Sequence, residues 1–596
     1  MSFPAKSKDV CSGCRSRKKK CDGTRPACTP CLKRGGICVY TPPPTNTQLT
    51  FAGDSWFAAD NLDAALADVA GWPAAGFADV PLPPGDDGVL PLAATVTVAE
   101  QPSWLGLESG IPMTETIQGL PTPENASPNS SSEPAMPPLD ATLDLVKVFF
   151  ERFYPSLPIM HKGRLISRLQ THGIDDIPPL LLLAIMTVAA SGHPNSQIRA
   201  TQAHWRVLAR DALKKSLPTE EHPLQTLQAA LMLIFDALQE GDYPVTWMML
   251  GEAWRKAAVI GYHQVDALDN ETMVQYLGSV EGLDEVQREE CRRVVWTFFI
   301  LDRGLCYPIG MVHAVDERRL VVNFPISEDE FQNAEVPDMD RPVLKYTNDM
   351  DRLIARVREH GRCTLLHYII LAYVLLGRVT EEVYMQDAEV QSTAALDGLI
   401  ERLVQIRLLL PGYASDLSLG KPADVPYVVW LSAVLGVSTI FLHHRAVPRG
   451  DEVNASNPAD VAAAAAQWPH AVRTARNTVQ LLRDACRAGS GSSFMLAHTT
   501  AALFVSTRVL IMEYLLSGAK RDRALRSDLE VLAAVSMQAH GSLGMLGRKF
   551  IVGFKFHVRM REEDVRASKD YGAKGLLKRC GDWAVADDGQ DIVIPE

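Results

Sequence analysis

The chain has 596 residues, of which 47% are hydrophobic and 22% are charged, a balance that is ordinary for a soluble protein with a sizeable core. This composition excludes a collagen, a coiled-coil rod and a chain that is disordered throughout. The formal net charge of −12 is unevenly distributed, because residues 1–40 carry +8, residues 41–138 carry −12 and the remaining residues carry −8. A basic head followed by an acidic segment is therefore the asymmetry that a function has to explain.

The cysteines are also unevenly distributed. Six of the eleven lie between positions 11 and 38. An odd total, and the absence of an apolar stretch in the first ten residues, argue against secretion and against a disulfide framework. We interpret the other five as buried small hydrophobic residues, with a redox sensor as the alternative. They are Cys291, Cys306, Cys363, Cys486 and Cys580.

The N-terminal cysteines form two equal halves, each with the spacing C-x2-C-x6-C. They are Cys11, Cys14, Cys21, Cys28, Cys31 and Cys38. Zinc prefers four tetrahedral ligands, so six thiolates can hold two ions only if two thiolates are shared. The symmetry of the halves points to Cys11 and Cys28 as the shared ligands. A segment of 40 residues has too small a core to fold alone, so the metal would supply the folding free energy. The pattern predicts two Zn²⁺ and disfavours a disulfide knot or an iron–sulfur cluster.

A run of basic side chains lies between the second and third of these cysteines. It consists of Arg15, Arg17, Lys18, Lys19 and Lys20. Lysine and arginine donate to O6 and N7 of guanine in the major groove, and the remaining charges would neutralise phosphates and make binding salt-dependent. The run therefore predicts a double-stranded DNA partner. A nuclear import signal without base recognition is the alternative.

The segment from Cys11 to Cys38 resembles the DNA-binding module of the fungal zinc binuclear cluster (Zn(2)-C6 type) transcription factors. The resemblance implies a nuclear protein with two zinc ions that share Cys11 and Cys28. It also implies that residues 15–20 form a short helix whose N-terminal end enters the major groove. There Lys18, with Lys19 as a second candidate, would read a CGG triplet.

Many proteins of this family continue from the cluster into a heptad coiled coil that dimerises them. Here three consecutive prolines follow at positions 42–44, and residues 41–138 contain no a/d heptads. Two arrangements remain open: binding of one triplet as a monomer, and a homodimer formed through the C-terminal domain.

Residues 41–138 hold 16 of the 38 prolines and no Lys or Arg, which predicts a disordered linker. Acidic residues alternate there with large apolar ones, a composition typical of activation segments that bind transcriptional coactivators. An inert spacer is the alternative. The alternation is clearest at Asp54, Trp56, Phe57, Asp60, Leu62, Asp63, Leu66, Asp68, Trp72, Phe77 and Asp79.

From Leu139 onward, apolar residues recur at helical spacing, and Asn457 with Pro458 has the form of a helix start. Residues 425–442 form an uncharged run of 18 residues, which reaches the length of a membrane span. A buried core helix is favoured for it, and no membrane partner is expected. The chain therefore divides into a zinc cluster module (1–40), a linker (41–138) and a large all-α regulatory domain (139–596). Helices are predicted over Leu139–Phe153, Leu180–Ala190, Leu224–Leu238, Val245–Ile260, Glu289–Leu301 and Thr364–Leu376.

Two stretches of this region, Trp247–His263 and Glu289–Arg303, resemble the fungal-specific transcription factor (middle homology) domain, with Phe149–His161 similar to its usual start. Cys291 departs from the pattern, because relatives often have an arginine there. We interpret Trp296 and Asp302 as buried structural residues, with Asp302 bonded to a nearby donor. Glu289 and Glu290 are expected to pair locally with Arg292 and Arg293 or to cap neighbouring segments.

Catalytic motifs such as G-x-S-x-G, H-E-x-x-H and the P-loop do not occur, and His161, His443 and His444 are interpreted as helix-end or core histidines. The sequence therefore predicts a nuclear, zinc-dependent regulator of RNA polymerase II transcription rather than an enzyme. An activator of a metabolic gene set is favoured, and secondary metabolism is one such set. The alternatives are a DNA-binding repressor and a ligand-sensing scaffold with a degenerate zinc head.

Overall fold

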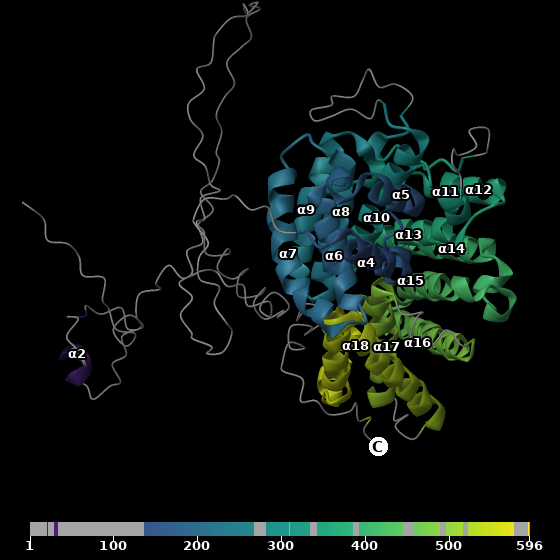
Figure 1. Ribbon diagram of the computed structural model, residues 1–596. Helices are drawn as coiled ribbons and strands as arrows, with labels where there is room; N and C mark the ends of the chain where they lie inside the picture. Colours follow the sequence, from purple (N-terminus) through teal and green to yellow (C-terminus); the bar gives the residue numbers. More distant parts are fainter. Residues whose placement is uncertain are drawn as a thin grey trace, which may run out of the picture.

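The structure is a computed structural model. It describes Cys21 and residues 29–33, 136–267, 282–308, 310–333, 343–384, 393–444, 458–488, 496–516 and 522–576, together with Ile594. Every regular element in these ranges is a helix, which confirms the predicted all-α C-terminal region (Figure 1). The buried hydrophobic side chains form one cluster from Leu145 to Ile594, so the region is a continuous helical array rather than a set of small bundles.

Within residues 136–267, six α-helices form the N-terminal part of the array. They are α4 (Leu139–Arg152), α5 (Lys162–His172), α6 (Pro179–Gly192), α7 (Ser196–Ser216), α8 (Pro223–Gln239) and α9 (Tyr243–Val259). Residues 180–190 of α6 are all buried, because α4, α7 and α8 pack against it on different sides. A helix that is apolar all round is stable in water only when it is enclosed in this way.

The remaining helices extend the array toward the C-terminus. They are α10 (Glu285–Cys306), α11 (Glu328–Asn333), α12 (Met350–His360), α13 (Leu365–Tyr384), α14 (Thr393–Leu409), α15 (Val425–His443), α16 (Pro458–Arg487), α17 (Ala497–Leu516), α18 (Arg523–Val558) and α19 (Glu562–Asp570). Short 3-10 turns connect them: η1 (Tyr154–Ser156), η2 (Ile174–Asp176), η3 (Tyr262–Gln264), η5 (Glu317–Arg319), η6 (Gly412–Ala414), η7 (Leu417–Leu419), η8 (Pro422–Asp424) and η11 (Gly572–Gly575).

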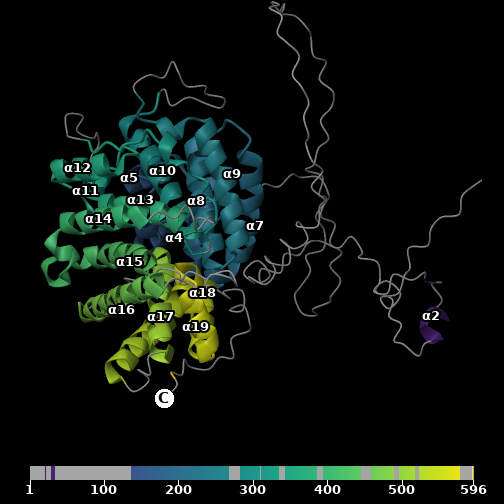
Figure 2. The ribbon, with the colours of Figure 1, turned by 180° about the vertical axis from the view of Figure 1, so that it is seen from behind.

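Helix α15 is the centre of the C-terminal half. It contacts α13, α14, α16 and α17, and Figures 1 and 2 show α14, α15 and α16 stacked one on another. Two described helical segments are long and apolar enough to cross a membrane, Pro422–His443 and Ala497–Leu516. In their most apolar windows, 78% and 83% of the residues are buried inside the domain. The interpretation of residues 425–442 as a buried core helix is confirmed.

The positions of these helices were predicted from the sequence more accurately than their first and last residues. Helix α10 begins four residues before the predicted Glu289, because Asp284 and Gln287 form a capping box at its start. It ends five residues after the predicted Leu301. Helix α13 runs eight residues beyond the predicted end. Pro458 is the first residue of α16, as expected, whereas Asn457 lies outside the described residues.

A buried lysine holds the end of α7. Lys256 of α9 is 6% exposed, and its Nζ donates to the backbone carbonyls of Ser216, Leu217 and Thr219 at 3.1, 2.9 and 2.6 Å. These carbonyls belong to the last turn of α7 and the loop after it, where the helix leaves its acceptors without intrahelical partners. The ammonium group therefore fixes the α7–α8 connection against α9.

We expect Lys256→Met to lower the free energy of unfolding of the helical domain by about 2 kcal/mol, because a charged donor to three carbonyls at the end of α7 is lost. Urea unfolding of the full chain, followed by circular dichroism, measures the change. Lys214→Met, at an exposed position of α7, is the matched control and should change the value by less than about 0.5 kcal/mol. Equal effects of the two substitutions would contradict the capping role.

Candidate metal centre and the buried ion pairs of the helical domain

The structure describes two of the six predicted zinc ligands. Cys31 lies on the four-residue helix α2 (Thr29–Leu32) and is 1% exposed, and Cys21 is half-buried. Burial of a thiol on so short a helix fits a ligand held from inside, and a set of six thiolates suits zinc. The other predicted residues lie outside the described part of the chain and stay predictions: Cys11, Cys14, Cys28, Cys38, Arg15, Arg17, Lys18, Lys19 and Lys20.

Helix α10 carries a buried ion pair near its start. The Glu289 and Arg293 side chains are each 1% exposed, and Nε of Arg293 donates to Oε1 of Glu289 at 2.9 Å. The same oxygen accepts the backbone N–H of Ile326 at 2.9 Å, and Nη2 of Arg293 donates to the Ile326 carbonyl at 2.9 Å. Nη1 of Arg293 donates to Glu328 of α11 at 2.6 Å. The pair therefore joins α10 to the segment that leads into α11.

A second buried pair lies near the other end of α10. Asp302 is fully buried and accepts the backbone N–H groups of Ala314 and Val315 at 2.9 and 3.2 Å. Nη1 of Arg303 donates to Asp302 at 2.6 Å and to the Val315 carbonyl at 3.1 Å. A Cβ at Gly377 of α13 would lie 2.6 Å from Nε of Arg303, so only glycine leaves room for the guanidinium. The expected structural role of Asp302 is confirmed.

Glu290 binds a neighbouring segment, whereas Arg292 binds one and also pairs locally as expected, because its Nη1 donates to Oε2 of Glu289 at 3.3 Å. Oε1 of Glu290 accepts the backbone N–H of His161 at 2.8 Å, and Nη2 of Arg292 donates to Asp266 at 2.7 Å. Asp266 also accepts the backbone N–H of Asn323 at 2.8 Å. Burial raises the pKa of the Glu290 carboxyl to about 7, against the lowering effect of that N–H group and of the nearby guanidinium groups.

The same region contains Trp296, which was expected to lie in the interior. Nε1 of Trp296 donates to the Asn323 carbonyl at 2.8 Å, and its ring packs against Phe324 and Tyr346 with centroid distances of 5.1 and 5.3 Å. Trp296 is 1% exposed. Because its side chain is enclosed and its one donor is used, Trp296 has a structural role, as expected.

The interpretation of the scattered cysteines is correct for two of them. Cys291 and Cys306 are fully buried, and burial raises the pKa of both thiols. Cys363 is half-buried with a pKa raised to about 11. Cys486 is exposed, so the prediction is wrong there, because Leu482 and Ala485 occupy the buried face of α16. Cys580 lies outside the described residues.

The three histidines singled out from the sequence stand at helix ends, as interpreted, but they are not isolated in space. His161 caps α5 and meets the ring of Phe331 edge-on with centroids 5.3 Å apart. His443, the last residue of α15, stacks on His470 at 4.9 Å, and His444 follows it as the C-cap. Within the described ranges, no group of three or more His, Cys, Asp or Glu is placed to hold a metal ion.

Comparison with known families matches two parts of the chain. Residues 9–47 match the fungal Zn(2)-Cys(6) binuclear cluster domain, which holds two zinc ions, and residues 146–373 match the fungal specific transcription factor domain. The chain belongs to the Zn(2)-C6 fungal-type transcription factors. The ion pairs of α10 thus lie inside the second matched domain of this transcription factor, as the resemblance of Glu289–Arg303 implied.

Several curated members of the family are similar to this Zn(2)-C6 transcription factor. A Zn(2)-C6 fungal-type transcription factor of Fusarium oxysporum f. sp. lycopersici is 25% identical, over 62% of this chain and 42% of its own length. An ascochitine biosynthesis cluster transcriptional regulator of Didymella fabae is 26% identical over 34% of this chain and 33% of its own. A depudecin biosynthesis cluster-specific transcription activator of Fusarium langsethiae is 24% identical over 49% of this chain and 55% of its own length.

The chain thus spans between a third and just over a half of the length of these relatives. No solved structure matches it.

We expect Arg293→Met to destabilise the helical domain by about 3–5 kcal/mol, because the buried Glu289 would lose its closest cation and keep only Arg292, at 3.3 Å. Thermal unfolding of the full chain measures the effect. Arg566→Met removes one partner of the Arg566–Glu562 pair, whose side chains are 61% and 56% exposed, and should cost no more than about 1 kcal/mol. A small effect of Arg293→Met would contradict the structural importance of the buried pair.

The raised pKa of Glu290 predicts a pH effect. Between about pH 4.5 and pH 7 the folded chain keeps a proton that the unfolded chain has released, so the free energy of unfolding falls as pH rises through this window. Glutamine cannot titrate but can still accept from His161. The stability of Glu290→Gln relative to the natural chain should therefore increase from pH 5 to pH 8, as measured by urea unfolding. Parallel pH profiles would show that the carboxyl is not perturbed.

Proposed function

We propose that this protein is a nuclear, zinc-dependent, sequence-specific DNA-binding regulator of RNA polymerase II transcription, and not an enzyme. The observation that carries the proposal is the presence in one chain of both matched domains, the binuclear cluster at residues 9–47 and the transcription factor domain at residues 146–373. A ligand-sensing scaffold with a degenerate head is disfavoured, because all six cysteines and the basic run are present.

The six cysteines of residues 11–38 would hold the two zinc ions as thiolates. When bound, the ions supply cross-links that replace the hydrophobic core which a module of this size lacks. Six thiolates and two Zn²⁺ together carry a charge of −2, against +8 from the side chains of residues 1–40. The loaded head therefore stays strongly basic, which suits a polyanionic partner.

Base recognition is assigned to the run between Cys14 and Cys21. Lys18, with Lys19 beside it, would donate to O6 and N7 of guanine in a CGG element, and the remaining bases would contact phosphates. Cross-linking of the flanking cysteines fixes the backbone of this short run, so its side chains lose less conformational entropy on binding. The same basic run can serve nuclear import.

The linker and the helical domain would act on transcription after DNA is bound. Residues 41–138 combine a charge of −12 with interspersed aromatic side chains, which suits recruitment of coactivators. We therefore favour an activator over a repressor. Two of the relatives are named for biosynthesis clusters, an ascochitine regulator and a depudecin activator, which favours a secondary-metabolite gene cluster as the target.

Genome-wide occupancy of the tagged protein tests this proposal. We expect peaks over CGG elements within one contiguous gene cluster, and their loss in Lys18→Ala, because one base contact contributes about 1–3 kcal/mol of discrimination. Lys33→Ala removes an exposed charge outside the basic run and should keep the same peaks with slightly lower height. Transcripts of the bound genes should fall on deletion of the regulator.

Two results would contradict parts of this proposal. Peaks that are unchanged in Lys18→Ala would mean that the head does not select the site. A rise of the transcripts on deletion would identify a repressor instead of an activator.

A further inference from the structure

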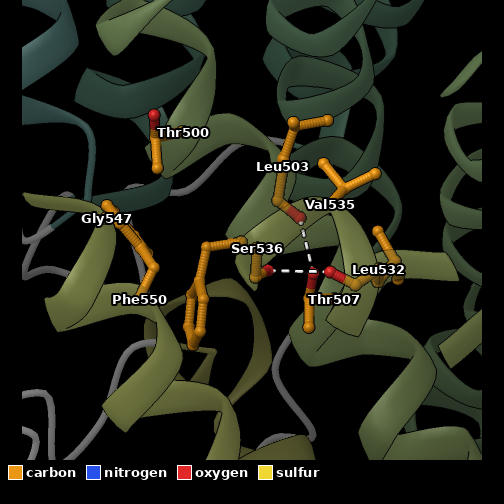
Figure 3. A pocket seen from close by; sticks show the side chains of 9 residues that line it. Thr500, Leu503, Thr507, Leu532, Val535, Ser536, Gly547 and Phe550 are labelled. Carbon is orange, nitrogen blue, oxygen red and sulfur yellow. Dashed lines mark hydrogen bonds between the residues drawn. The ribbon is translucent and has the colours of Figure 1, made fainter. Parts of the chain in front are cut away.

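Helix α18 is broken in the middle. Gly544 has φ 56° and ψ −130°, a conformation open to glycine and strained for other residues, so Arg523–Leu543 and Met545–Val558 are two helical pieces joined by one flexible residue. Both pieces pack against α17. Beside the break, side chains from α17 and from both pieces of α18 line a pocket (Figure 3).

The pocket wall is mainly apolar. Leu503 and Phe504 of α17 face Leu532 and Val535 of the first piece of α18, and Phe550 of the second piece closes the pocket. The rings of Phe504 and Phe550 are 5.4 Å apart and tilted. About 340 Å³ of the space between these side chains is free of protein atoms, and part of this space is open solvent. The enclosed part has room for one or two water molecules, so a larger guest requires Phe550 to move.

Three hydroxyl groups also line the pocket, and each already donates its hydrogen. Thr507 donates to the Leu503 carbonyl at 3.0 Å, and Ser536 donates to the Leu532 carbonyl at 2.8 Å, as drawn in Figure 3. Thr500 donates to the Leu496 carbonyl at 3.4 Å. A hydroxyl that has donated its one hydrogen keeps lone pairs and can act only as an acceptor. The polar side of the pocket therefore offers acceptors to a hydrogen-bond donor.

The break lies beside the residue that closes the pocket. Phe550 and Gly547 belong to the second piece of α18, which meets the first piece at Gly544. A Cβ at Gly544 would meet no atom within 4 Å, so the positive φ, and not crowding, is what favours glycine at this position.

We propose that this pocket binds a small molecule with one apolar ring or short chain and a single O–H or N–H donor, such as a phenol or an alcohol. The apolar body lies between Phe504, Phe550 and Val535, and its donor bonds to Thr507 or Ser536. The proposal goes beyond DNA recognition and does not depend on it, because all the residues that form the site lie in the C-terminal helices.

Fluorine NMR of the zinc-loaded full chain tests the site with two probes, para-fluorophenol and fluorobenzene, which differ in the donor. Both should bind. The double substitution of Thr507→Val and Ser536→Ala should weaken para-fluorophenol about tenfold, as expected for loss of acceptors worth about 1 kcal/mol or more, and leave fluorobenzene unchanged. Continued binding of fluorobenzene also shows that the variant is folded.

Ser506→Ala is the matched control. Ser506 lies on the same helix but donates to Thr478 of α16, away from the pocket, so this substitution should affect neither probe. The proposal is overturned if neither probe binds the natural chain, if the double variant binds para-fluorophenol as tightly as the natural chain does, or if the double variant loses both probes alike.

Discussion

The ion pair between Glu289 and Arg293 is the interaction on which the helical domain depends most. Both side chains are almost completely buried, and each has a second ionic partner, because Glu289 also pairs with Arg292 at 3.3 Å and Arg293 with Glu328 at 2.6 Å. Arg293 also fixes the Ile326 carbonyl and Glu328, and Glu289 holds the N–H of Ile326. One helical turn of α10 thereby positions the connection between α10 and α11 with polar contacts, where apolar packing alone would not specify a unique path.

This constraint lies within Glu289–Arg303, one of the stretches that carry the family resemblance. The second buried pair, Asp302 with Arg303, binds Ala314 and Val315, so the two ends of α10 fix the two ends of an irregular connection. Apolar packing then completes the domain around two enclosed helices, α6 in the N-terminal half and α15 in the C-terminal half. The polar contacts specify the path of the chain and the apolar helices provide most of the free energy of burial.

Much of this architecture follows from the sequence. The apolar runs at α6, α8 and α15 are long and unbroken, so the burial of these helices could be predicted from periodicity and length. Helix α7 was missed because its 21 residues bury only Ala209 and Leu213 fully and its sequence is polar. The partners of Glu290 and Arg292 could not be predicted either, since His161 and Asp266 are distant in sequence and only tertiary packing brings them close.

The pocket beside Gly544 could not be predicted from the sequence, because tertiary packing also brings its residues together. A glycine within a helical pattern indicates only that the helix is less stable there. The hydroxyls of Thr507 and Ser536 come from different helices, so their proximity is not visible in the sequence. The zinc head is the opposite case, because its regular cysteine spacing encodes a metal site without any knowledge of the fold. Metal binding would order the N-terminal head, whereas the ion pairs of α10 specify the path of the chain in the helical domain.

The central claim is that two zinc ions held by six thiolates make the N-terminal head a DNA-reading module. Native mass spectrometry of the full chain, purified with zinc, tests it most directly. The account predicts two zinc ions per chain, both lost when Cys14→Ala is introduced, with no mass deficit from disulfides. A chain that carries one zinc ion or none, or that lacks the hydrogens of oxidised cysteines, would contradict it.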